Sequence, residues 1–221
     1  MLQMEGIQVT IRGFIILRWV SLEVPAGALI ALVGRNGAGK TTSLKSIMGL
    51  LPVLSGSIQL DGADLLQVPA HRRARLGIGY MPEDRRLIGP LTVEDNIWMP
   101  AWASKLEGGK ERLAYIYRKM PEVAELTRHR AATLSGGQQK MVALARALMS
   151  GTKLLLLDEP FEGLSPALGA KLAETIRDLG RDGLSVLIAE SDVKRLGRVE
   201  TVYTIERGEI VRSTHAGRDG F

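Results

Sequence analysis

The fold of this chain is decided by the stretch Gly34-Arg35-Asn36-Gly37-Ala38-Gly39-Lys40-Thr41, which has the spacing G-x-x-x-x-G-K-T. An apolar strand is predicted before it, from Leu29 to Val33, and a helix after it, from Thr41 to Met48. Glycines at these positions let backbone N–H groups turn inward around an anion, and the N-terminus of the helix adds its positive end. With both flanks in place, the stretch is interpreted as a phosphate-binding loop of the Walker A type rather than a glycine-rich turn.

Two side chains of this loop carry chemistry. Lys40 would reach the β- and γ-phosphates of a nucleotide, and the Thr41 hydroxyl can ligate Mg²⁺. The predicted ATP-binding residues are the loop and the residue after it: Gly34, Arg35, Asn36, Gly37, Ala38, Gly39, Lys40, Thr41 and Thr42.

Around the loop, short apolar runs alternate with helical stretches, which predicts an α/β fold. Strands are predicted over Ile7 to Ile11, Ser21 to Val24, Ala28 to Val33, Ser57 to Leu60, Ile78 to Met81, Leu154 to Leu157, Ser185 to Ala189, Thr201 to Ile205 and Glu209 to Arg212. Several are continuous apolar runs followed by helices, a pattern typical of a mostly parallel sheet that is buried on both faces. Since ligands of such sheets lie beyond the carboxyl ends of the strands, we expect the chemistry just after them.

Composition sets outer limits on function. With 221 residues, 45% of them apolar, the chain can form one compact domain, and the absence of cysteine excludes disulfides and thiolate metal sites. We expect no secretory leader and no membrane span, because the longest apolar runs are far too short. The 29 Lys and Arg residues exceed the 24 Asp and Glu residues. This excess fits a solvated surface, nucleotide phosphates, anionic lipid or nucleic acid, and charge alone leaves these open.

A pair of carboxylates follows the apolar strand Leu154 to Leu157, in the sequence Asp158-Glu159-Pro160. Asp158 can hold Mg²⁺, usually through water, and Glu159 can polarise the water that attacks a γ-phosphate. Acidic residues often follow strands at turns, so the pair alone is weak evidence for catalysis. The phosphate loop upstream makes the catalytic interpretation strong.

A second candidate phosphate site lies in the sequence Leu134-Ser135-Gly136-Gly137-Gln138, ahead of an amphipathic helix predicted from Lys140 to Met149. Ser135 and Gln138 have the spacing of a capping box, which would start the helix. A free helix N-terminus beside two glycines can also bind phosphate.

The three motifs, in this order, resemble the ABC ATPase family across nearly the whole chain. The resemblance implies an α/β fold, with a P-loop NTPase (RecA-like) core at residues 1–83 and 134–221 and an N-terminal antiparallel β subdomain. It also implies an inserted helical subdomain at about 84–133, where strand signals stop and helical patterns carry Trp98 and Trp102. ATP and Mg²⁺ are the implied cofactors, and the implied activity is ATP hydrolysis.

In that family the signature of one cassette closes on the nucleotide held by another, so these residues are expected to act in trans: Leu134, Ser135, Gly136, Gly137 and Gln138. The expected partners are a second cassette, either a copy of this chain or a related one, transmembrane permease subunits, and indirectly an external solute-binding protein. No nucleic acid partner is expected. The implied location is the cytoplasmic face of the plasma (inner) membrane, as a peripheral subunit.

Two variants point to a subgroup. Glu83 stands where most cassettes have the Q-loop glutamine, and Ser165 stands where the D-loop usually has aspartate. Both are similar to the cassettes of branched-chain amino-acid, amide and urea importers. A separately encoded exporter cassette and a soluble ABC ATPase that acts on nucleic acid stay open as alternatives.

Three positions depart from the family pattern. Ser191 takes the place of the switch histidine and has no titratable ring; the expected catalytic residues are therefore Glu159, Lys40 and Ser191. Glu83 joins Thr41 and Asp158 as an expected metal ligand. The aromatic residue that stacks on adenine in many cassettes falls near Ile11, and Phe14 either replaces it or packs in the core.

Overall fold

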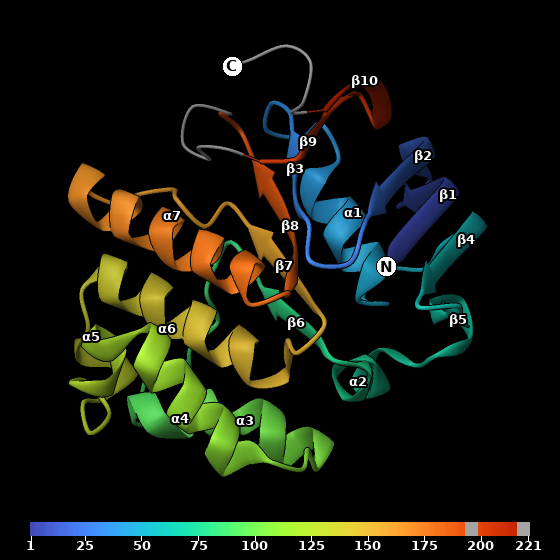
Figure 1. Ribbon diagram of the computed structural model, residues 1–221. Helices are drawn as coiled ribbons and strands as arrows, with labels where there is room; N and C mark the ends of the chain where they lie inside the picture. Colours follow the sequence, from blue (N-terminus) through green and yellow to red (C-terminus); the bar gives the residue numbers. More distant parts are fainter. Residues whose placement is uncertain (193–198, 216–221) are drawn as a thin grey trace.

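The computed structural model describes residues 1–192 and 199–215, and it contains two β-sheets with helices around them (Figure 1). The larger sheet has the strand order β10-β9-β3-β8-β7-β6. Its strands are β3 (Leu29–Val33), β6 (Ile78–Met81), β7 (Leu154–Asp158), β8 (Ser185–Glu190), β9 (Thr201–Glu206) and β10 (Glu209–His215). Neighbouring strands are parallel except for β9 and β10. The predicted α/β organisation is confirmed.

Both faces of this sheet are buried, as the continuous apolar runs predict. In β3, Leu29 and Ala31 belong to one hydrophobic core, while Ile30 and Leu32 belong to the other. The first core is completed by α3, α6 and α7, and the second by α1 and the antiparallel sheet. The bounds are α1 (Lys40–Ile47), α3 (Val93–Ser104), α6 (Gly136–Ser150) and α7 (Pro166–Arg181). This double burial fixes the carboxyl ends of β3, β8 and β7 side by side.

The smaller sheet is antiparallel and has the order β2-β1-β4-β5. Its strands are β1 (Leu2–Ile11), β2 (Phe14–Val24), β4 (Ser55–Leu60) and β5 (Ala63–Asp64). Arg12 and Gly13 both have positive φ, 51° and 83°, and form the tight turn between β1 and β2. The turn places Phe14 at the tip of the hairpin, where the residue is 74% exposed. The alternative in which Phe14 packs in the core is therefore wrong.

Residues 84–133 form helices joined by loops. They contain α3, α4 (Gly109–Lys119), α5 (Pro121–Ala124) and the 3₁₀ turn η3 (Ala131–Thr133), gathered on the far side of the parallel sheet from the antiparallel one. Trp98 and Trp102 of α3 stack with ring centroids 6.2 Å apart. The remaining short elements are α2 (Ala70–Arg73), η1 (Leu65–Gln67) and η2 (Ala74–Leu76). In the described part of the chain, no helix is long and apolar enough to cross a membrane.

Candidate nucleotide site

The phosphate loop connects β3 to α1, and its glycines are required by close packing as well as by conformation. A Cβ at Gly34 would lie 2.2 Å from the Ile205 carbonyl oxygen, so no side chain fits there. Gly39 has φ 117°, a left-handed conformation that side chains rarely adopt. The chain can therefore turn directly from the buried strand into the helix, with Lys40 and Thr41 in the first turn of α1.

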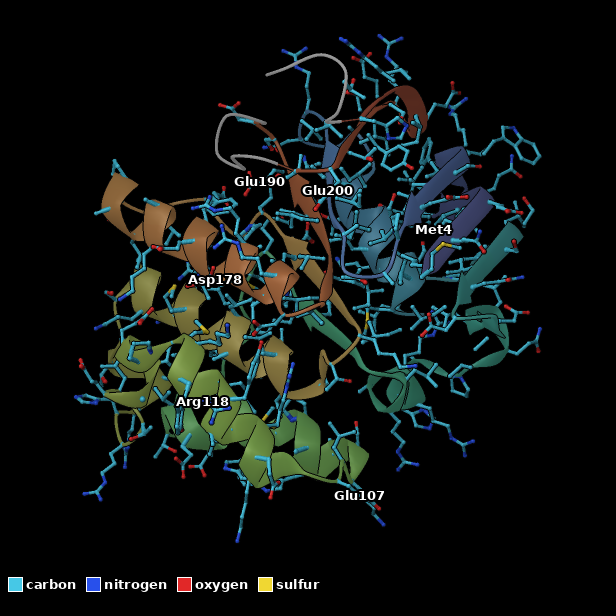
Figure 2. The ribbon with its side chains drawn as sticks, viewed as in Figure 1. Met4, Glu107, Arg118, Asp178, Glu190 and Glu200 are labelled. Atoms are coloured by element: carbon cyan, nitrogen blue, oxygen red, sulfur yellow. The ribbon has the colours of Figure 1, made fainter. Side chains whose placement is uncertain are left out.

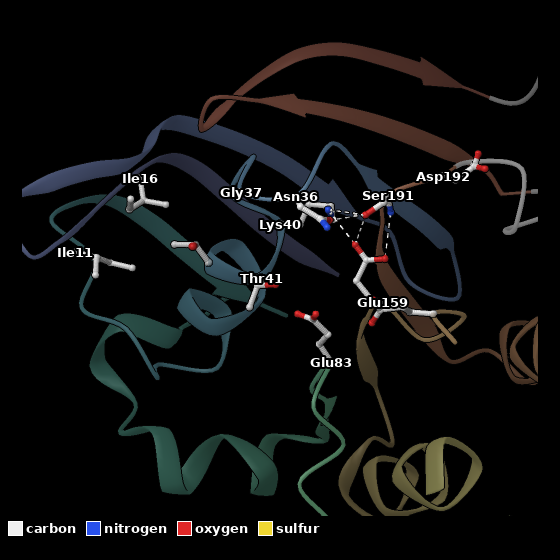
Figure 3. Close-up of a pocket in the computed structure, with 13 residues that line it drawn as sticks. Ile11, Ile16, Asn36, Gly37, Lys40, Thr41, Glu83, Glu159, Ser191 and Asp192 are labelled. Atoms are coloured by element: carbon white, nitrogen blue, oxygen red, sulfur yellow. Dashed lines mark hydrogen bonds and ion pairs between the residues drawn. The ribbon is translucent and has the colours of Figure 1, made fainter. Parts of the chain in front are cut away.

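Lys40 is buried and held by several oxygen atoms. Its Nζ donates hydrogen bonds to the Gly34 carbonyl, 2.7 Å away, and to Ser191 Oγ, 3.2 Å away. It also forms an ion pair with Glu159 Oε1 at 3.0 Å, and the two side chains are only 6% and 10% exposed. The predicted catalytic residues Lys40, Glu159 and Ser191 thus meet at one point, which Figure 3 shows.

Ser191 joins this group from the end of β8. Its Oγ lies 2.6 Å from Glu159 Oε1 and 3.0 Å from Asn36 Oδ1, and its backbone N–H donates to Glu159 Oε2 at 3.3 Å. Burial acts to raise the pKa of Glu159, but the hydrogen bonds from Ser191 and Lys40 outweigh it, so this pKa lies below its ordinary value. The Glu159 carboxylate is therefore ionised and fixed in orientation.

Asp158 ends β7 and is completely buried. Its two oxygens accept hydrogen bonds from the Thr41 hydroxyl at 3.0 Å and from the Tyr80 hydroxyl at 3.3 Å. Burial raises the pKa of Asp158, because hydroxyl groups offset only part of the loss of water. A buried carboxylate beside a hydroxyl, with no ion pair to a Lys or Arg of the described chain, is a donor set that suits a hard divalent cation.

Glu83 lies in the loop after β6 and lines the same cavity as Thr41. Together with Asp158 they give three oxygen-bearing side chains from three separate segments. Within the described residues, no group of three or more His, Cys, Asp or Glu side chains is arranged as a complete metal site. Mg²⁺ fits this donor set if waters and substrate phosphates supply the other ligands, as is usual for this ion.

The cavity beside the phosphate loop measures about 580 Å³. Lys40, Thr41 and Glu159 line one end, and Ile11 and Ile16 line the other (Figure 3). Phe14 is not among the lining residues. The apolar side chains available to a nucleotide base are thus the aliphatic pair at positions 11 and 16.

Glu190 is a residue of this site that sequence reasoning missed. It is the last residue of β8 (Figure 2), directly before Ser191, and it is fully buried. Its Oε1 accepts the Phe161 backbone N–H at 3.0 Å, while its Oε2 has no hydrogen-bond partner among residues 1–192 and 199–215. Burial, together with the neighbouring Glu159 carboxylate, raises the pKa of Glu190 to about 7. The only sequence signal was a glutamate directly before the position of the switch residue.

The signature motif lies elsewhere on the chain. Ser135 caps α6 and forms the predicted capping box with Gln138, which confirms that prediction. Ser135, Gly136 and Gln138 are exposed, and none of the signature residues lines the cavity at the phosphate loop. The two candidate phosphate sites of one chain therefore do not converge.

Comparison with known proteins now decides the family. Residues 17–162 match the family model described as ABC transporter. This chain belongs to the ABC transporter family. The chain is 38% identical to the high-affinity branched-chain amino acid transport ATP-binding protein BraG of Pseudomonas aeruginosa, over 87% of this chain and 83% of that protein.

Two further comparisons bear on the fold and on transport direction. The lipopolysaccharide export system ATP-binding protein LptB of Escherichia coli is 36% identical over 89% of this ABC chain and 80% of its own length. The dimeric structure of a bacterial ABC transporter cassette superposes with a TM-score of 0.87 at 25% identity, covering 100% of both chains. The P-loop NTPase core with its antiparallel β subdomain is confirmed, and so is the assignment as an ATP-hydrolysing subunit. ABC cassettes of this kind dimerise and work with membrane permeases.

Proposed function

We propose that this ABC cassette drives the import of branched-chain amino acids or of related amides and urea. The observation that carries the proposal is the likeness to BraG, a branched-chain amino acid transport protein, over most of both chains. Glu83 and Ser165, at the Q-loop and D-loop positions, support the same subgroup. The likeness to LptB makes an exporter the second candidate.

An assay on the assembled transporter separates the two. The chain is copurified with its permease subunits, reconstituted in vesicles, and its ATPase rate is measured with a solute-binding protein loaded with leucine or with urea. Stimulation by a loaded binding protein supports import. Stimulation by lipopolysaccharide, with no response to any loaded binding protein, would assign the cassette to export.

The proposed nucleotide site uses the phosphate loop and the Ile11–Ile16 pair. Lys40 binds the β- and γ-phosphates, for which its ammonium group is already buried and oriented by the Gly34 carbonyl. Thr41, Asp158 and Glu83 would hold Mg²⁺ with the nucleotide. When bound, the ion neutralises phosphate charge. Tyr80 orients Asp158 through its hydroxyl.

Glu159 is proposed as the general base that takes a proton from the attacking water. Its lowered pKa keeps it able to accept a proton at neutral pH, and Ser191 with Asn36 keeps it in place. Ser191 replaces the switch histidine as a hydrogen-bonding group without a charge.

A single substitution tests the role of Glu159. Glu159→Gln preserves size and keeps one hydrogen-bonding oxygen, but it replaces the other carboxylate oxygen by an amide nitrogen and so removes the base. We expect Mg-ATP binding to be retained and steady-state turnover to fall by about 10²–10⁴-fold. Turnover at the parent rate would remove Glu159 from the mechanism.

The proposed assembly is a pair of cassettes on permease subunits at the cytoplasmic face of the membrane. The signature residues Leu134 to Gln138 act on the nucleotide of the partner cassette. The exposure of Ser135, Gly136 and Gln138 supports this, because a site that serves another chain must be accessible. The helical segment 84–133 is proposed to contact the permease, and the solute-binding protein acts only through it.

A further inference from the structure

The loop between β6 and α3 holds two consecutive arginines in the left-handed region, with φ of 60° at Arg85 and 51° at Arg86. Residues with side chains rarely adopt this conformation, and it persists only where the surroundings impose it. Arg146 of α6 imposes it here. Its guanidinium donates to the backbone carbonyls of both Arg85 and Arg86, the latter at 2.6 Å.

With the loop held by these Arg146 hydrogen bonds, the Arg85 side chain lies over the first turn of α6. A Cβ added at Gly136 would lie 3.5 Å from Arg85 Nη1 and 3.8 Å from Nη2. Nη1 donates to Gln139 Oε1 at 3.0 Å. The guanidinium is thus in contact with a glycine of the signature motif, and it is half-buried rather than extended into solvent.

Electrostatics alone would not place a cation there. The N-terminus of a helix carries a partial positive charge, which favours anions. The first turn of α6 has no acidic residue, and within the described chain Arg85 forms no ion pair with a carboxylate. The adjacent Arg86, in contrast, pairs with Asp84 at 2.9 Å. A guanidinium next to the N-terminus of a helix adds a charged donor to the backbone N–H groups there, and such a combination binds anions.

We propose that Arg85 contacts the terminal phosphate of the ATP held by the partner cassette, as the cationic residue of the signature half-site. The inference rests on the proposed action of the signature in trans. Ser135 and the glycine N–H groups are neutral donors, so Arg85 would add the charge that they lack. Glu83, two residues earlier, lines the cavity of its own chain. One short segment therefore reaches both nucleotide sites of a dimer.

The variants are Arg85→Gln, which keeps N–H donors but loses the charge, and Arg85→Lys, which restores the charge. Arg86→Gln is the matched control, because Arg86 has the same backbone conformation and a surface ion pair. We expect Arg85→Gln to lower the ATPase rate about tenfold to a hundredfold, Arg85→Lys to recover part of it, and Arg86→Gln to leave it unchanged. Equilibrium binding of Mg-ATP to the phosphate loop should stay at the parent value, which also shows that the variant is folded. Equal losses in Arg85→Gln and Arg86→Gln would overturn the proposal.

Mixed dimers decide whether Arg85 acts in trans. An Arg85→Gln chain is mixed with a Lys40→Ala chain, and a Ser135→Arg chain mixed with the same Lys40→Ala chain is the benchmark. If Arg85 serves the partner, both defects fall on one composite site and the other site is intact, so activity returns above that of either parent. Recovery with Ser135→Arg but not with Arg85→Gln would reject Arg85 while the trans site stands. Recovery with neither would reject the trans site and this proposal with it.

Discussion

At the scale of single residues, Lys40 faces three kinds of oxygen: backbone carbonyls and the Ser191 hydroxyl, which orient it, and a carboxylate that neutralises it. We expect Lys40→Ala to weaken Mg-ATP binding about tenfold or more, because a charge-assisted hydrogen bond to phosphate is lost. Equilibrium titration with a fluorescent ATP analogue measures this. Lys45→Ala, on the same helix, is the control and should bind normally. Unchanged affinity in Lys40→Ala would show that the loop is not the phosphate site.

Glu190 gives a pH dependence whose direction follows from burial. Its pKa of about 7 in the folded chain is above its ordinary value of 4.5. Between these pH values the folded state keeps a proton that the unfolded state has released, so the stability contributed by Glu190 falls as the pH rises from about 4.5 to about 7.

A variant that cannot ionise should escape this loss. We expect Glu190→Gln to be more stable than the parent at pH 8, by about 1–3 kcal/mol, and to differ little near pH 5. Urea unfolding at the two pH values measures the difference, and Glu174→Gln on the exposed face of α7 is the control. A stability difference that is the same at both pH values would contradict the buried, protonated carboxyl.

The residues of the site were unequally predictable from sequence. Lys40, Thr41, Asp158 and Glu159 were placed correctly beside one another because their motifs attach them to strand ends. Glu190 was not predicted. Its raised pKa depends on its burial at the end of β8 and on the nearby Glu159 carboxylate, 31 positions earlier in the chain, and no local sequence pattern records either. The roles assigned to all of these residues stay predictions.

At the scale of elements, caps and buried strands were predicted well. The helix after the phosphate loop was predicted to start at Thr41, and α1 starts at Lys40. The strand β2 was predicted only from Ser21, although it begins at Phe14. Its first half has shifts of register against β1, and Trp19 has φ 57°, so the alternation that marks a strand is interrupted.

The helical segment 84–133 leads to a prediction about where the permease binds. Trp102 is 56% exposed and stacks on Trp98, which presents an aromatic surface on α3. Because the chain has no cysteine, Trp102→Cys introduces a unique site for a thiol crosslinker. We expect it to crosslink to a permease subunit in the assembled transporter.

The matched control is Val211→Cys, because Val211 is 54% exposed and belongs to β10, a strand at the opposite end of the molecule from α3 in Figure 1. It should remain uncrosslinked under the same conditions. Efficient crosslinking at position 211 with none at position 102 would show that the permease contacts β10 and not α3, which would contradict the proposed docking surface.

At the scale of the whole molecule, the phosphate loop and the signature motif lie apart within one chain, although ATP hydrolysis is proposed to need both at the same nucleotide. The phosphate loop lies between the two sheets, while the signature caps α6 and points outward. The order of the motifs was readable from sequence, but their separation was not, because it depends on how the helical segment packs against the core. Hydrolysis is therefore expected to require two cassettes.

The most direct test mixes two inactive chains. Lys40→Ala damages the phosphate loop and Ser135→Arg damages the signature, so each variant alone forms dimers with two damaged sites. In a mixed head-to-tail dimer, one site carries both defects and the other is intact. We predict that the mixture hydrolyses ATP faster than either parent, and that the activity rises more than linearly with protein concentration while association is incomplete. A parent chain that turns over ATP as a monomer, with specific activity independent of concentration, would contradict the account.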